Sequence, residues 1–408
     1  MTRSIGRTAG SVGIAILVTS AALSGAASAA GAGPGIGIGS RADAGARSGR
    51  QASAAPAAAV PHGFKAASIT WTTRQHGWVL GAAPCGKKTC SDVIATTDGG
   101  TTWRLLGAVN SPLATMGQAV VAGITEIRFA TAKVGWAFAP YLFHTTDGGS
   151  SWASMKIPGG GKQVIALAAN ATGAYAVVST CKWAMGGLCP ISFWRTSALT
   201  GSSWTRIPLN LPKNITAEVA ASGKTVYVVD PLSENSDLKD VFYASTDDGL
   251  QFSSRTVPCD NAEHDALIGV AASSQSDVAL LCEGNPGTGL SDKYVYTSSN
   301  TAKSYRFAGH LAPPNQNYGI QAELAESPSG NLAVATSSDG SLIFVNDTHK
   351  RTWTMLIAKS DGGAGWNDIV YVSNEEAWVV YAPVDDFSGI GQVYVTHDGG
   401  HHWSVAAL

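Results

Sequence analysis

The residues of this chain that could perform chemistry are carboxylates and histidines near its C-terminal end. Asp385 and Asp386 stand side by side in PVDDFSG, and glycoside hydrolysis uses a pair of carboxylates. A solvated turn explains them better, because adjacent residues rarely converge on one substrate bond. His397, His401 and His402 have the residue type of metal ligands. We expect no metal there, because a repeated segment with other residues at these positions contains them.

This eight-residue segment, here called the box, recurs along the chain. Its strong copies read TTDGGTTW at 96–103, TTDGGSSW at 145–152, STDDGLQF at 245–252 and THDGGHHW at 396–403. Degenerate copies end at Trp204, Tyr305 and Trp353. Each copy therefore ends 48 to 53 residues after the one before it. So regular a spacing indicates a repeat architecture.

A second apolar segment recurs in phase with the box. Examples are HGWVLG at 76–81, VGWAFA at 134–139 and EAWVVY at 376–381, each preceded by another short apolar strand. Each unit therefore contains strands A, B and C, then the box, then strand D. Four short strands in ~50 residues predict an all-β fold, a seven-bladed β-propeller over 63–408, with the box on the turn between strands C and D. The first blade is N-terminal and the last C-terminal, so we expect no strand shared between them.

The box residues are predicted to be structural. The aspartate can accept hydrogen bonds from backbone amides of the turn, the fifth-position glycine permits a backbone conformation that a Cβ hinders, and the final aromatic ring packs between blades. The residues expected in these roles are Asp98, Trp103, Asp147, Trp152, Asp247, Asp398 and Trp403. Repetition around a ring indicates architecture rather than a catalytic or metal site.

The N-terminal residues are predicted to direct export. Arg3 and Arg7 precede an apolar run at about 12–22, and Ala27-Ser28-Ala29 offers a cleavage site, so residues 1–29 read as a signal peptide. The run is shorter than the ~20 residues of a membrane span, although an uncleaved anchor is the alternative. Residues 30–62, rich in Gly, Ala, Ser and Pro, are predicted to be a flexible linker. We expect a secreted protein, free or associated with the cell envelope, with no membrane span after cleavage.

The six cysteines are predicted to form disulfides, because an exported chain with an even number of cysteines meets an oxidising compartment. The sequence leaves several connectivities open. Proximity favours the pairs Cys85–Cys90 and Cys181–Cys189, which leaves Cys259 with Cys282. Their spacing is unlike that of zinc sites, and we expect neither a metal nor a cofactor.

Charge argues against a nucleic-acid partner. Charged residues make up 14% of the chain, the formal net charge is −2, and Lys and Arg form no basic stripe.

With respect to oligomeric state, we expect a monomer.

The box resembles the Asp-box, or BNR (bacterial neuraminidase) repeat, S/T-x-D-x-G-x-T/S-W. The resemblance covers 67–408 and implies the propeller fold of sialidases, xyloglucan-active hydrolases, sortilin-type receptors and photosystem assembly factors. It is specific for the fold and not for an activity. Sialidases also carry an Arg-Ile-Pro motif ahead of the first box, whereas Arg206-Ile207-Pro208 follows the third box here. No arginine triad and no Tyr–Glu nucleophile pair can be assigned.

A binding site is expected on the face opposite the boxes, here called the loop face, because the B–C and D–A connections there are long. The candidate contact residues on it are Trp183, Tyr318, Trp366, Asp385 and Asp386. Trp183 is the strongest, since it lies between two paired cysteines; packing on its own loop is the alternative.

The sequence thus favours a non-catalytic propeller that binds a protein or a cell-envelope glycan through the loop face. Two alternatives stay open: a sialidase-like glycoside hydrolase, and an assembly factor for a membrane protein. Whether the chain is an enzyme is left open, with a binding role preferred.

Overall fold

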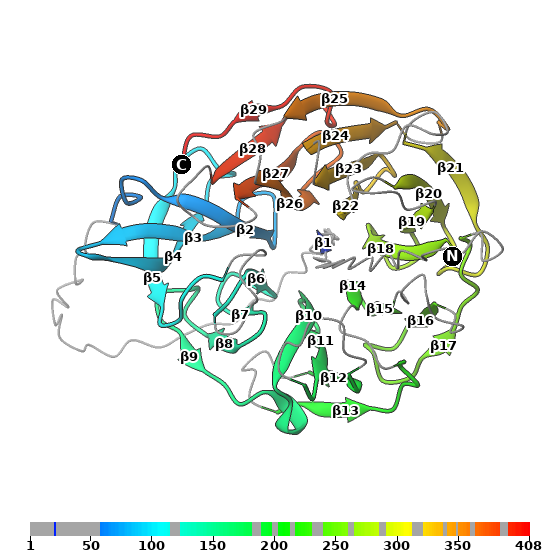
Figure 1. Cartoon of the computed structure of the whole chain (residues 1–408), viewed down its shortest axis with the longest axis horizontal. Coiled ribbons are helices and arrows are strands. Elements are labelled where there is room, and N and C mark those ends of the chain that lie inside the picture. Colours follow the sequence, from blue (N-terminus) through cyan, green and yellow to red (C-terminus); the bar gives the residue numbers. More distant parts are fainter. Residues whose placement is uncertain are drawn as a thin grey trace, which may run out of the picture.

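The computed structural model contains seven four-stranded antiparallel sheets arranged as blades around an axis (Figure 1). It describes residues 20–21, 58–114, 123–181, 189–197, 203–212, 217–230, 240–259, 265–284, 291–311, 321–337, 341–347, 350–359, 364–383 and 391–408. The prediction of an all-β, seven-bladed propeller is confirmed. Within these ranges, no helix has the length and apolar character needed to cross a membrane.

Each blade takes four consecutive strands of the chain. Blades 1 and 2 contain β2 (Lys65–Trp71), β3 (Gly77–Cys85), β4 (Lys88–Thr96), β5 (Arg104–Val109), and β6 (Glu126–Phe129), β7 (Gly135–Phe138), β8 (Leu142–Thr145), β9 (Ala153–Ser154). Blades 3 and 4 contain β10 (Gln163–Asn170), β11 (Gly173–Ser179), β12 (Ile191–Thr196), β13 (Thr205–Ile207), and β14 (Glu218–Ser222), β15 (Thr225–Asp230), β16 (Val241–Ser245), β17 (Ser253–Ser254). Blades 5 to 7 contain β18 (Ala266–Ala272), β19 (Val278–Gly284), β20 (Asp292–Ser298), β21 (Arg306–His310), then β22 (Gln321–Glu326), β23 (Leu332–Ser337), β24 (Ser341–Asn346), β25 (Thr354–Lys359), and β26 (Ala364–Tyr371), β27 (Ala377–Pro383), β28 (Gln392–Thr396), β29 (Ser404–Val405).

The first strand of each blade, strand A, lies innermost and contacts strand A of the next blade around the whole ring (Figure 1). Strand B beside it is buried on both faces, as in β7 and β11, because the neighbouring blades cover it. This burial explains why strand B reads as an unbroken apolar run. Strand D lies outermost, and both residues of β9 are exposed. A further two-residue strand, β1 (Ser20–Ala21), pairs in parallel with the inner strand β18.

The turn between strands C and D has the expected hydrogen bonds. In blade 1 the Thr96 hydroxyl donates to Asp98 Oδ1 (2.7 Å), and the amides of Gly100 and Thr102 donate to Thr96 Oγ1 and Asp98 Oδ1 (both 2.9 Å). The same three bonds form around Asp147, Asp247, Asn300 and Asp398. Blade 5 therefore keeps the turn although asparagine replaces the aspartate.

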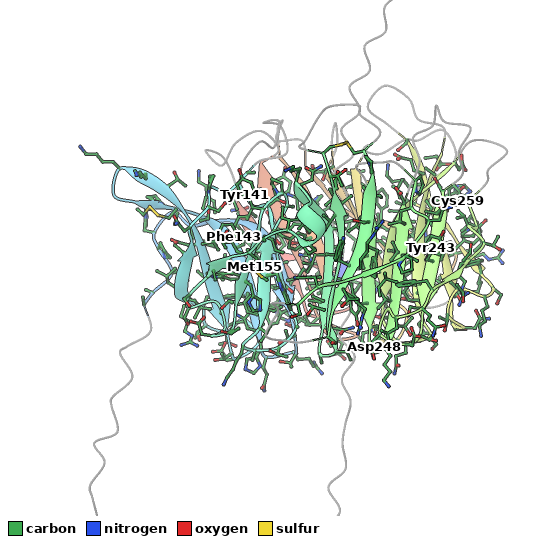
Figure 2. The ribbon with its side chains drawn as sticks, turned by 90° about the horizontal axis from the view of Figure 1, so that it is seen from below. Tyr141, Phe143, Met155, Tyr243, Asp248 and Cys259 are labelled. Atoms are coloured by element: carbon green, nitrogen blue, oxygen red, sulfur yellow. A yellow bond between two sulfur atoms is a disulfide. The ribbon has the colours of Figure 1, made fainter. Side chains whose placement is uncertain are left out.

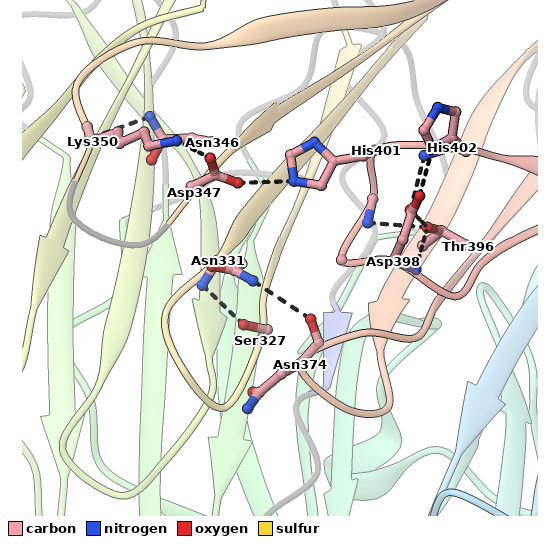
Figure 3. Close-up of polar contacts among 12 residues, drawn as sticks. Ser327, Asn331, Asn346, Asp347, Lys350, Asn374, Thr396, Asp398, His401 and His402 are labelled. Atoms are coloured by element: carbon pink, nitrogen blue, oxygen red, sulfur yellow. Dashed lines mark hydrogen bonds and ion pairs between the residues drawn. The ribbon is translucent and has the colours of Figure 1, made fainter.

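The histidines of the last box have carboxylate partners in the protein (Figure 3). His402 Nδ1 lies 2.5 Å from Asp398 Oδ2, where the boxes of blades 1 and 2 use a hydroxyl. His401 Nε2 lies 3.0 Å from Asp347 Oδ1, which follows strand C of blade 6. Across the described ranges, no group of three or more His, Cys, Asp or Glu side chains could hold a metal ion. These contacts assign both histidines to the turn and to the blade 6–blade 7 junction.

The ring closes between blades 1 and 7 without a shared strand, as the sequence predicts. Trp71 of β2 packs against Trp103 at a ring-centroid distance of 5.9 Å and against Trp378 of β27 at 4.9 Å. The Ala66 amide donates to the Gly391 carbonyl at 2.9 Å. Apolar burial and this backbone bond thus contribute to joining the two ends of the fold.

The box geometry predicts how substitutions at Asp147 affect stability. Asp147→Ala removes the acceptor for the Ser151 amide and hydroxyl and should lower the free energy of unfolding by about 1–3 kcal/mol. Asp147→Asn should cost less than about 1 kcal/mol, because Asn300 forms the same backbone bond in blade 5. Urea unfolding measures the free energy of both variants. Equal losses in the two variants would refute the role of the side-chain oxygen at position 147 as the acceptor for the Ser151 amide.

Candidate functional site

The three predicted disulfides are present, and all lie at the loop face. Cα–Cα distances are 5.8 Å for Cys85–Cys90, 5.8 Å for Cys181–Cys189 and 5.6 Å for Cys259–Cys282. In the side view of Figure 2, Cys259 lies towards the upper face of the ring, and Asp248, a box residue, lies at the lower face. The first two pairs close the B–C connections of blades 1 and 3, and the third ties the chain after blade 4 to β19. Cross-links of this kind restrict the loops that they close.

Of the five predicted contact residues, Trp366 lies within the described part of the chain. Trp183, Tyr318, Asp385 and Asp386 lie outside the described residues, and their role stays a prediction. Trp366 lies in β26 rather than in a loop; it is 1% exposed, with its ring centroid 4.6 Å from that of Tyr381. In this position it packs in the apolar core between blades 6 and 7.

The box tryptophans show the expected packing. Trp103 is 9% exposed and packs at the blade 1–blade 7 junction. Trp152 and Trp403 are partly buried, and each indole donates to the carbonyl of a glycine in its own box, at 3.1 and 2.7 Å. Their rings therefore close the turn as well as cover the blade.

Three buried glutamates that sequence analysis did not single out, Glu126, Glu218 and Glu323, line the inner strands; we call them the inner ring. They occupy the same position of strand A in blades 2, 4 and 6. Their partners in strand B are Phe138, Val229 and Ala335. In each blade, this partner lies three residues after the strand B residue that pairs with the first residue of the box. They are 3%, 2% and 6% exposed. A comparison of strand A between alternate repeats would have revealed them.

A buried ionic contact, here called the closure clamp, joins blades 7, 1 and 2. Asp368 of β26 accepts from Arg128 of β6, with Oδ1 2.7 Å from Nη2 and Oδ2 3.2 Å from Nη1. Its Oδ2 also accepts from the Ile69 amide (3.0 Å) and the Ser68 hydroxyl of β2. Asp368 lies at a bulge in β26 with a φ of 50°, which directs its carboxylate to these donors. One carboxylate thus binds three blades.

Arg128 also connects the closure clamp to the inner ring. Its Nη2 lies 3.3 Å from Glu126 Oε2. Burial nevertheless raises the pKa of Glu126 to about 8, against the opposing effect of Arg128 and with a further rise from Asp368. Burial likewise raises the pKa of Glu218 and of Glu323 well above the ordinary value, and for Glu323 the nearby Glu218 and Asp368 add to the rise. Burial therefore favours the neutral form of all three inner-ring carboxyl groups in the folded chain.

A second buried ionic contact lies at the loop-face end of blade 5. Lys293 Nζ lies 3.3 Å from Glu283 Oε1 and 2.6 Å from Ser291 Oγ, which itself donates to Glu283. Burial lowers the pKa of Lys293, whereas Glu283 opposes that change. Ser291 and Lys293 are each 2% exposed, so this group stabilises the blade below the Cys259–Cys282 disulfide rather than presenting a nucleophile.

The comparisons with known proteins agree on the fold. No protein-family model and no curated protein matches the sequence. Among solved structures, the chain is similar to YCF48 from Cyanidioschyzon merolae, with 13% identity, a TM-score of 0.50, and coverage of 84% of this chain and 98% of that one. It is also similar to the propeller domain of the trilobed protease from Pyrococcus furiosus, described as having an open velcro topology. The identity is 9%, the TM-score is 0.48, and the match covers 86% of this chain and 97% of that one. A third similar structure is the GH93 α-L-arabinofuranosidase of Fusarium graminearum with arabinobiose. The identity is 11%, the TM-score is 0.42, and the match covers 80% of this chain and 92% of that one.

The strand order makes the chain a seven-bladed β-propeller, and its likeness to YCF48 agrees with this fold. At 13% identity this likeness concerns the fold and not the activity.

The inner ring predicts that stability falls as the pH rises. A folded-state pKa of about 8 for Glu126, against an ordinary value of 4.5, stabilises the fold at low pH, and this contribution is lost as the pH rises through the folded value. The lowered pKa values of Asp147 and Asp247 have the opposite effect. They stabilise the fold above the ordinary pKa of 3.8, and this stabilisation is lost only as the pH falls below that value. The free energy of unfolding should therefore be highest near pH 5 and decline towards pH 8.

Glu126→Gln tests this assignment, because glutamine stays neutral at every pH. Its unfolding free energy should decline less steeply than that of the parent protein, by about 1.4 kcal/mol per pH unit for the one proton removed from the linkage. Urea unfolding at half-unit steps from pH 5 to 8 provides the slopes. Parallel curves for the two proteins would contradict a raised pKa at Glu126.

Proposed function

We propose that this chain is a secreted, non-catalytic member of the Asp-box propellers that binds a protein or a cell-envelope glycan through its loop face. The observation that carries the proposal is the placement of the three disulfides, all at the loop face. The Cys85–Cys90 bridge crosses a tight hairpin, whereas the Cys181–Cys189 bridge closes a longer connection at its base. A long connection held in this way is a common form of binding surface on a rigid scaffold. At the opposite face, the box side chains are occupied by bonds within their own turns.

The proposed location and family have separate support. Three disulfides are compatible with an extracellular protein and agree with the predicted signal peptide, since they persist in oxidising compartments. The three-bond turn, repeated around the ring with its central Asp or Asn, supports the Asp-box assignment. We propose a monomer, with no cofactor.

A glycoside hydrolase is the second candidate, and the inner strands hold the observation that favours it. Glu126, with a pKa of about 8, has the protonation state of a general acid, and Asp368 could supply a carboxylate. However, Glu126 is 3% exposed, and Asp368 already accepts hydrogen bonds from Arg128 and from the backbone of blade 1. A substrate would have to displace the closure clamp, so the binding role is preferred.

The test compares one substitution on each face of the secreted protein. Trp183→Ala on the loop face should weaken retention of the protein on cell-wall glycan or on solubilised envelope protein by tenfold or more, about the effect of losing a buried aromatic anchor. Leu250→Ala is the matched control, because Leu250 is an exposed apolar residue, 52% exposed, on a box turn of the opposite face. Its retention should equal that of the parent protein.

A panel of fluorogenic glycosides, sialosides included, separates the binding role from the hydrolase. The proposal expects no turnover by the secreted protein. Turnover that disappears in the Asp385→Asn, Asp386→Asn double variant, or in Glu126→Gln, would replace the binding role with catalysis. Equal retention of Trp183→Ala and Leu250→Ala on every envelope fraction would remove the loop face as the binding surface. Retention on membrane protein alone would select the assembly-factor alternative.

A further inference from the structure

The inner strands hold more acidic groups than cations. Among the described residues, the buried cations are Arg128 and Lys293, and Lys293 pairs with Glu283 in blade 5. Arg128 serves Asp368 and Glu126 on one side of the axis. Glu218 is held by a backbone bond, from the Val270 amide to Oε2 at 2.8 Å. The inner ring thus has one cation beside it, and that cation is already bound to Asp368.

Among the described residues, Glu323 differs from the other two members of the inner ring in its Oε2, which has neither a hydrogen bond nor an ion pair. Its side chain is buried, and Oε2 makes no hydrogen bond within the described structure. It lies close enough to Glu218, Asp368 and Glu126 for each to raise its pKa. A buried carboxyl oxygen left without a donor is costly, which indicates a group that a ligand or a proton satisfies.

The axis has room for an extended backbone. β1 lies there in parallel pairing with β18, Ser20 opposite Ala271 and Ala21 opposite Ala272, and it contacts strand A of blades 3, 4, 6 and 7. The free edge of β18 therefore pairs with a peptide strand, a mode of recognition that a glycan does not offer. Because β1 belongs to the predicted signal peptide, its removal on export would leave this edge to another segment.

The chemistry of the inner ring favours an organic cation over a metal ion. The described residues contain no group of three or more ligands placed to hold a metal ion. A guanidinium or ammonium group carries several N–H donors on a long side chain and can reach separated acceptors. Its positive charge would also keep the inner ring in the ionised form.

We propose that the inner ring receives an arginine or lysine side chain from an extended segment of a partner protein that pairs with β18. This inference rests on the proposed binding function and names the chemistry of the partner.

The experiment titrates two synthetic pentapeptides into the secreted protein, with its mature N-terminus established by mass spectrometry. One peptide is acetyl-Ser-Ala-Arg-Ala-Ser-amide; the other replaces arginine with citrulline, which has the same shape without the charge. Calorimetry at pH 8 should give a Kd at least about tenfold tighter for the arginine peptide. Glu218→Gln combined with Glu323→Gln should abolish this preference.

Glu326→Gln is the matched control. Glu326 is also buried in β22 and also has a pKa raised by burial to about 8, but it lies at the far end of the strand, near Ser273 and Asp277. The affinity of the Glu326→Gln variant for the arginine peptide should equal that of the parent protein. If the double variant does not fold, Glu323→Gln alone tests the inference, because Glu323 Oε2 makes no hydrogen bond within the described structure.

Equal binding of the two peptides, or unchanged binding after substitution of the inner ring, would overturn the inference. Those results leave the loop-face test with Trp183→Ala unaffected, so the inference can fail while the proposed function stands. Preference for the arginine peptide that depends on the inner ring, together with no effect of Trp183→Ala on retention, would keep the inference and reject the loop face.

Discussion

The fold depends on joining its first and last blades, which share no strand. The carboxylate of Asp368 does this at the centre of the ring, where it accepts from Arg128 of blade 2 and from the Ile69 amide of blade 1. Desolvation makes such a buried pair expensive, but loss of either partner leaves an uncompensated buried charge. Trp71, Trp103 and Trp378 add apolar packing farther out at the same junction. Together these contacts do what a shared strand would do.

The same constraint explains the polar residues on the inner strands. Except for β18, which pairs with β1, strand A has no neighbouring strand on the side of the axis. The strand A amides that face the axis therefore need other acceptors. Side chains of the preceding blade provide them: Asp368 for Ile69, Ser68 for Ile127, and Glu218 for Val270. Acidic and hydroxyl groups at the axis therefore have a structural role first. Glu323 Oε2 accepts no such amide bond within the described structure, and this unused acceptor supports a role in binding.

Local features of the sequence predicted most of the architecture. The box, the strand periodicity and the cysteine pairs depend on residues close in the chain or on the ~50-residue repeat, and all three appear in the structure. The closure clamp was not predictable in this way, because Arg128 and Asp368 are 240 residues apart and only the closed ring brings them together. Trp366 looked like a loop residue but begins a buried stretch of strand A, since β26 starts earlier than its apolar pattern suggests.

The most direct test of this account is a double-mutant cycle on the closure clamp, with Arg128→Gln, Asp368→Asn and the double variant compared by urea unfolding. The account predicts that each single substitution lowers the free energy of unfolding by about 3–5 kcal/mol, and that the double variant loses much less than the sum of the two. Losses that add within about 0.5 kcal/mol would show that the two residues act independently. Closure would then rest on the tryptophan packing instead.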